Sequence, residues 1–214
     1  MAPITQLPCE IVVSILRELD NLSSLLSSLL SCRYVYESFK ESPGLIAEIV
    51  ERQITPALAP YAVATEEAER LKPHTGTAIC RMVKTLHERP SDLANRLPTM
   101  AIPTLVALGR KHDLIHGLVA EFSGAAWARL TNDDKFTASG RLSLSPAEYT
   151  RFCRAFYRFE LFFNLFRRPY SASLENLHEN TSEWFFSKHT PWENEQIAAI
   201  NDFMELKLSR GWES

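Results

Sequence analysis

Residues 22–31 read LSSLLSSLLS, and this stretch indicates the fold class of the chain. Its leucines recur at i, i+3, i+4, i+7 and i+8, so a helix gathers them on one side and turns the intervening serines away. Asp20 and Asn21 precede the run and can cap the helix N-terminus. The pattern therefore predicts an amphipathic helix whose leucines pack against another element.

A helix is expected on either side of this run. Upstream, Pro8 suits a first helical turn, Glu10 complements the helix dipole there, and apolar residues then recur at helical spacing. Downstream, a short helix is expected from about residue 31 to 39, before the serine, proline and glycine of residues 42–44 interrupt the pattern. We therefore predict a three-helix unit over residues 1–42.

The rest of the chain, residues 43–214, is also expected to be helical. A long helix is predicted from about Pro103 to Leu130, and two capping boxes, Ser145–Glu148 and Thr190–Glu193, predict the starts of two more. No segment shows the period-2 alternation that is typical of strands. The predicted fold is thus all-α, with a three-helix unit followed by an irregular helical domain.

An aromatic stripe follows the first capping box at helical spacing and comprises Tyr149, Phe152, Phe156, Phe159, Phe163 and Phe166. Such a stripe behind a well-formed cap is more often core than a ligand pocket or a partner groove. We therefore predict that Phe152, Phe156, Phe159 and Phe163 are largely buried. The stretches 132–141 and 167–180 are expected to be connecting segments.

The composition argues against two classes of partner. The chain has 214 residues and a formal net charge of -3, whereas binding to nucleic acid demands clustered basic residues. Its most apolar stretch, Tyr149–Phe166, contains three arginines, which are costly to bury in lipid. We therefore expect no nucleic-acid partner and no membrane partner. Because the N-terminus also lacks a secretory signal, we expect a cytoplasmic or nuclear location.

Candidate catalytic and metal-binding residues are few. His112 and His116 share one face of a predicted helix, but neither a third ligand nor an H-E-x-x-H motif accompanies them. Cys153 with a distant histidine is a conceivable nucleophile, yet it lies within the aromatic stripe, where a packed thiol is expected. The widely spaced Cys9, Cys32, Cys80 and Cys153 predict neither a disulfide nor a zinc site. We therefore expect no catalytic residue, no metal, no cofactor and no enzymatic activity.

The N-terminal helices carry more apolar surface than a unit of about forty residues can bury. The excess either packs on the rest of the chain or docks on another protein. Periodicity favours neither of these two interpretations.

Residues 4–40 resemble an F-box. They follow the family's L-P-x-E-I-x-x-x-I-L-x-x-L opening and its later Cys-Arg-aromatic close through Leu7, Pro8, Glu10, Ile11, Ile15, Leu16, Leu19, Leu25, Leu29, Cys32, Arg33, Tyr36 and Phe39. The segment departs from the family at Val35, where many F-boxes have tryptophan. The remainder is similar to F-box-like proteins of filamentous fungi in residues 48–54, 144–157 and 191–195.

The resemblance implies a binding protein. An F-box docks on the Skp-type adaptor of a cullin–RING ubiquitin ligase, and the rest of the chain recruits a protein substrate for ubiquitination. The residues that the resemblance assigns to the adaptor interface are Leu7, Pro8, Glu10, Ile11, Ile15, Leu16, Leu25 and Leu29. Catalysis would belong to other subunits, and this chain would contribute proximity between substrate and enzyme.

Two alternatives remain open. The first is an F-box protein that binds the adaptor without delivering a substrate, or a helical protein-interaction scaffold that uses these leucines internally and has no role in a ubiquitin ligase. The second is a small all-α enzyme built around Cys153 or the histidine pair. Co-purification of the adaptor, with or without cullin, would distinguish the first alternative, and a polar cluster in a pocket would favour the second.

Overall fold

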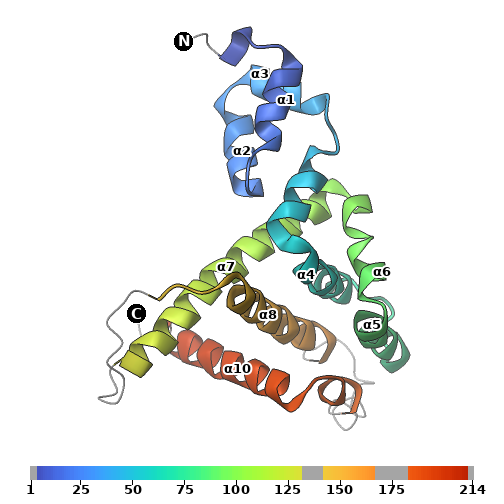
Figure 1. The fold of residues 1–214 in the computed structure, drawn as a ribbon. Coiled ribbons are helices and arrows are strands. Elements are labelled where there is room, and N and C mark those ends of the chain that lie inside the picture. The colour runs from blue at the N-terminus through green and yellow to red at the C-terminus, as the bar shows by residue number, and fades with distance from the viewer. Residues whose placement is uncertain (1–3, 132–141, 167–182, 212–214) are drawn as a thin grey trace. The chain divides into compact units, whose positions relative to one another are not determined.

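The computed structural model describes residues 4–131, 142–166 and 183–211 (Figure 1). Over these ranges every regular element is a helix and no strand is present, so the prediction of an all-α fold is confirmed. The connecting segments expected at 132–141 and 167–180 lie outside the described residues.

The helices follow the order expected from the sequence. They are α1 (Cys9–Arg17), α2 (Leu22–Ser31), α3 (Arg33–Lys40), α4 (Leu45–Glu69), α5 (Gly76–Glu88), α6 (Pro90–Ala94), α7 (Ile102–Thr131), α8 (Pro146–Phe166) and α10 (Pro191–Gly211). Short 3-10 turns, η1 (Ile4–Gln6), η2 (Leu97–Thr99) and η3 (Phe186–Lys188), lie between them or ahead of them. The long helix predicted from Pro103 to Leu130 is α7.

Both capping boxes form as predicted. The Ser145 N–H donates to the Glu148 carboxylate at 2.8 Å, and the Glu148 N–H donates back to the Ser145 hydroxyl at 3.3 Å. Thr190 and Glu193 make the same two bonds at 3.0 and 3.3 Å. Each box satisfies N–H groups that the first turn of a helix leaves without a backbone acceptor, so α8 and α10 start where the sequence indicates.

The described chain divides into two compact units. The first comprises Met1–Val63 and Ser91–Asp113, and the second comprises Ala64–Pro90 and Leu114–Ser214. The division expected at residue 42 falls inside the first unit, because α1–α3 cluster there with later segments of the chain.

The first unit has a core of aliphatic side chains. Its fully buried members include Val12, Leu22, Leu25, Val35, Leu45, Ile49, Ile54, Leu58, Leu93, Leu97 and Leu108. Within it, α3 packs against both α1 and α2. The leucine stripe of α2 is therefore used in part for internal packing.

The second unit has a core with more aromatic side chains. Its buried members include Ile79, Val83, Leu86, Ile115, Val119, Phe156, Tyr157, Leu161, Leu165, Phe185 and Ile200. Helices α8 and α10 pack against each other. At their α7 side, the Phe122 ring meets those of Phe152, Phe156 and Phe203 at centroid distances of 5.3–6.1 Å.

The buried face of α8 differs from the predicted one. Of the four phenylalanines expected in the core, only Phe156 is buried; Phe152 and Phe159 are half-buried, and Phe163 is 38% exposed. The innermost row is instead Cys153, Tyr157, Leu161 and Leu165, each at most 1% exposed. The prediction for Phe163 was wrong because aromatic spacing selects a row of side chains, whereas burial depends on which rows the neighbouring helices cover.

A candidate docking surface on the N-terminal helices

Helix α1 has two apolar faces. Val12 and Leu16 are buried, at 0% and 4% exposure, on the side that packs against α3. Ile11 and Ile15 lie one turn apart on another side and are 47% and 46% exposed. Because the core uses the first face, the isoleucines form an apolar strip on the surface, and Pro8 at the start of the helix is exposed as well.

The start of α1 is set by Pro8, whose extended backbone (φ -53°, ψ 146°) precedes the first helical residue. Its carbonyl oxygen accepts the N–H groups of Ile11 and Val12 at 3.0 and 3.2 Å. The hydroxyl of Tyr34, in α3, donates to the Leu7 carbonyl oxygen and attaches this entry segment to the third helix. As a result Leu7 is half-buried, whereas Pro8 faces solvent.

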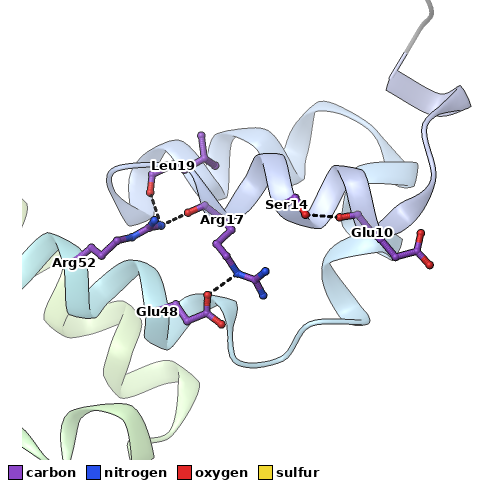
Figure 2. Close-up of polar contacts among 6 residues, drawn as sticks. All are labelled: Glu10, Ser14, Arg17, Leu19, Glu48 and Arg52. Atoms are coloured by element: carbon purple, nitrogen blue, oxygen red, sulfur yellow. Dashed lines mark hydrogen bonds and ion pairs between the residues drawn. The ribbon is translucent and has the colours of Figure 1, made fainter.

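The far end of α1 is attached to α4 (Figure 2). Arg17 pairs with Glu48 at 2.7 Å, and Arg52 donates to the carbonyl oxygens of Leu19, at 3.1 Å, and of Arg17. The Arg17 and Glu48 side chains are 44% and 45% exposed, so their ion pair contributes at most about 1 kcal/mol. Its effect is chiefly to orient the helix.

Helix α2 is held by a polar centre around Gln53. The Gln53 amide accepts the Leu22 N–H at 3.2 Å and donates to the Gly109 carbonyl oxygen at 3.1 Å and to Asp113 at 2.7 Å. Asp113 also accepts the Ser23 hydroxyl at 2.8 Å. Sequence reasoning did not identify this centre, because its members are 31 to 90 residues apart.

We expect Gln53→Ala to destabilise the first unit by about 1–3 kcal/mol, since partly buried polar groups lose their partners. The matched control is Ser23→Ala, which removes a single exposed hydrogen bond and should cost about 0.5 kcal/mol or less. Urea denaturation of both variants followed by circular dichroism measures the difference. Equal losses would contradict a central role for Gln53.

The structure distributes the eight residues assigned to the adaptor interface over three environments. Pro8, Glu10, Ile11 and Ile15 are exposed, Leu7 and Leu29 are half-buried, and Leu16 and Leu25 are buried. Leu16 and Leu25 are 4% and 0% exposed and pack in the core, so they are not available to a partner in this conformation. Other exposed apolar side chains of these helices, which sequence reasoning did not single out for the surface, are Ile4, Leu30 and Tyr36.

A hollow of about 570 Å³ lies between α1 and α3, next to this surface. It is lined by Cys9, Glu10, Val13, Ser14, Arg17, Tyr34, Glu37, Ser38, Glu41 and Ser42. Lys40, which pairs with Glu37 at 2.5 Å, lowers the pKa of that carboxyl through a hydrogen bond. Burial and Glu10 raise the pKa of the Cys9 thiol, which therefore stays neutral and is a poor nucleophile.

The other candidate residues are Cys153, His112 and His116. Cys153 is fully buried, and burial raises the pKa of its thiol to about 11, so no thiolate forms near neutral pH. His112 is buried, whereas His116 is exposed and shares a hydrogen bond of 3.0 Å with the Tyr149 hydroxyl. Among the described residues, no three His, Cys, Asp or Glu side chains are placed to hold a metal ion.

Cys9, Cys32, Cys80 and Cys153 are all free thiols. In the part of the chain that the structure describes, no helix combines the length and the apolar character needed to cross a bilayer.

Comparisons of the chain with family models, with curated proteins and with solved structures find no match. Over the described residues, the fold consists of helices arranged in two compact units. The most distinctive feature of the first unit is the exposed apolar strip of α1.

Proposed function

We propose that this chain is a binding protein that docks on a Skp-type adaptor through its N-terminal helices and recruits a protein substrate to a cullin–RING ubiquitin ligase. The observation that carries the proposal is the exposed strip of Ile11 and Ile15 on α1, beyond the F-box-like Leu7-Pro8 opening. The substrate is a protein whose identity the sequence does not specify.

The energetics of the strip support a protein partner. Two isoleucines that are nearly half exposed leave apolar surface in water, and covering such surface is favourable by about 25 cal/mol per Å². They lie on a helix whose two ends are attached to the neighbouring helices α3 and α4. Docking would therefore order few additional backbone groups, which reduces the entropic cost of association.

The scaffold alternative has one observation in its favour. Leu16 and Leu25, which the F-box resemblance places at the interface, are used for packing within the chain. A scaffold without adaptor binding would need these leucines only for that purpose. The two functions differ in what they require of Ile11 and Ile15, so a test on the exposed strip separates them.

Replacing Ile11 and Ile15 together with alanine should weaken binding to a purified Skp-type adaptor by at least about tenfold. Each central anchor of an interface is worth about 2 kcal/mol, and about 1.4 kcal/mol already gives that factor. The helical content and thermal stability of the chain should change little, because neither side chain belongs to the core. Isothermal titration calorimetry measures the affinity, and circular dichroism checks the fold.

The matched control is the neighbouring pair on the buried side of the same helix, Val12→Ala with Leu16→Ala. These changes should destabilise the first unit by several kcal/mol, since each creates a cavity in the core. If the intact chain does not bind the adaptor, or if the Ile11 and Ile15 variant binds it unchanged, the adaptor function is wrong. The scaffold function is then preferred.

A further inference from the structure

Two histidine rings meet inside the second unit. His87, on α5, and His189, which directly follows η3, have ring centroids 4.7 Å apart with planes inclined at 49°. His189 is only 6% exposed. Within the described chain, neither ring nitrogen of His189 has a hydrogen-bond partner, nor has Nε2 of His87, although all three atoms are buried. An imidazole held in this way is costly to charge, because it is removed from water and its buried ring nitrogens make no hydrogen bond within the described chain.

The surroundings of the pair are apolar on one side and charged on the other. The Phe185 ring packs edge-on against His189 at a centroid distance of 4.7 Å. Arg158 of α8, which is 3% exposed and whose charge acts on both histidines, forms an ion pair of 2.5 Å with Glu193 of α10. Lys188 of η3 is a further cation, and its charge lowers the pKa of His87. Both rings thus feel the charges of Arg158 and Glu193, and His87 also feels that of Lys188.

These surroundings favour neutral imidazoles. Burial, followed by Arg158 and His87, lowers the pKa of His189 to about 4. Burial and Arg158 likewise lower the pKa of His87. Burial opposes ionisation of Glu193, but the Thr190 N–H and Arg158 outweigh it and bring its pKa to about 2. The ion pair therefore stays charged over the range in which the histidines titrate.

We propose that the contact between His87 and His189 is an acid-sensitive latch, which holds η3 and the start of α10 in place near neutral pH and releases them in mildly acidic solution. Protonation gives the His189 ring a positive charge and a second N–H group, and neither ring nitrogen has a hydrogen-bond partner in the closed arrangement of the described chain. Arg158 repels this charge more strongly than Glu193 attracts it, and the His87 ring repels it once that ring is protonated as well. Release exposes the rings to water, which solvates both the charge and the N–H groups.

The segment that the latch holds is tied together locally. The His189 N–H donates to the Phe186 carbonyl oxygen at 3.2 Å, and the Asn194 amide donates to the same oxygen at 3.0 Å. The capping box of Thr190 and Glu193 lies between these contacts. The η3 turn and the first turn of α10 are therefore expected to move as one piece, and their release also separates Glu193 from Arg158.

The sign and size of the pH dependence of opening follow from the linkage between protonation of His189 and the equilibrium between the closed and open forms. The closed form binds a proton at His189 more weakly than the open form, whose pKa is the ordinary 6.5. The closed form is therefore fully favoured above pH 6.5 and loses population as the pH falls towards 4. Between pH 7.5 and pH 5, His189 alone should raise the opening equilibrium constant by about thirtyfold.

The test uses amide hydrogen exchange of the full chain at pH 7.5 and pH 5, corrected for intrinsic exchange rates. In the unmodified protein, the opening constant of η3 and the first turn of α10 should rise by about thirtyfold. In His189→Phe, which fills the same apolar space without a titrating group, the rise should be at least about tenfold smaller. The control His116→Gln removes an exposed histidine of the same unit and should keep the full rise.

An equal opening constant at both pH values in the unmodified protein, or an unchanged rise in His189→Phe, overturns the latch. Should that variant not fold, NMR titration of the imidazole protons in the unmodified chain decides. A midpoint for His189 near 4 in the closed form, with an opening constant that starts to rise as the pH falls below 6.5, supports the latch. A midpoint near 6.5 in the closed form, or an opening constant that does not rise between pH 6.5 and 4, overturns the proposal.

Discussion

Glu193→Ala is expected to destabilise the second unit by about 3–5 kcal/mol, the usual cost of removing one member of a buried ion pair. The Arg158 side chain is 3% exposed and lies 2.5 Å from the Glu193 carboxylate, whose side chain is 26% exposed, so the substitution removes one counter-ion of a buried charge. The same carboxylate accepts the Thr190 N–H at 3.0 Å, and the α10 cap is lost as well. Urea denaturation at pH 7, followed by circular dichroism, measures the loss.

The matched control is Glu148→Ala in the other capping box. Glu148 makes the same bond to the backbone N–H of Ser145, at 2.8 Å, but both residues are exposed. Loss of a cap alone costs about 0.5–2 kcal/mol. The additional loss of stability in Glu193→Ala, compared with Glu148→Ala, therefore measures the contribution of the ion pair with Arg158. Similar losses in the two variants would show that the Arg158 guanidinium does not depend on this carboxylate.

Phe156→Ala should also cost about 3–5 kcal/mol, because truncating a buried phenylalanine leaves a cavity that the core fills incompletely. The ring is 3% exposed and meets Phe122 and Phe203 edge-on at centroid distances of 6.1 and 6.4 Å. Both contacts lie inside the second unit. Thermal unfolding and urea denaturation of purified protein measure the effect.

Phe163→Ala, two turns along the same helix, is the comparison. This ring is 38% exposed, and its truncation should cost about 1 kcal/mol or less. Large losses of equal size at Phe156 and Phe163 would instead match the buried row that aromatic spacing predicts. The observed face requires a clearly larger loss at Phe156.

Much of the local structure of the chain is readable from short motifs. Three helices start where the sequence predicts. Two of them start at the capping boxes of Ser145 and Thr190, and the third starts at Asn21, whose side chain accepts the Ser24 N–H at 2.8 Å. These interactions join residues three positions apart, so the information needed to predict them is contained within one helical turn.

The candidate docking surface was predictable only in part. The spacing of Ile11 and Ile15 with Val12 and Leu16 indicates a helix that is apolar on more than one side. It does not indicate which side the core covers. That choice follows from the packing of α1 on α3 and from the attachment of Arg17 to α4, both of which join distant parts of the chain.

The all-α class and the helix starts therefore follow from the amino-acid sequence, because periodicity and capping act over a few neighbouring residues. The exposure of Ile11, the buried row of α8 and the meeting of His87 with His189 follow only from packing. In each case the environment of a side chain is created by elements distant in sequence, such as α5 and η3 around the two imidazoles. Local propensity carries no information about these contacts, since burial is a property of the assembled core.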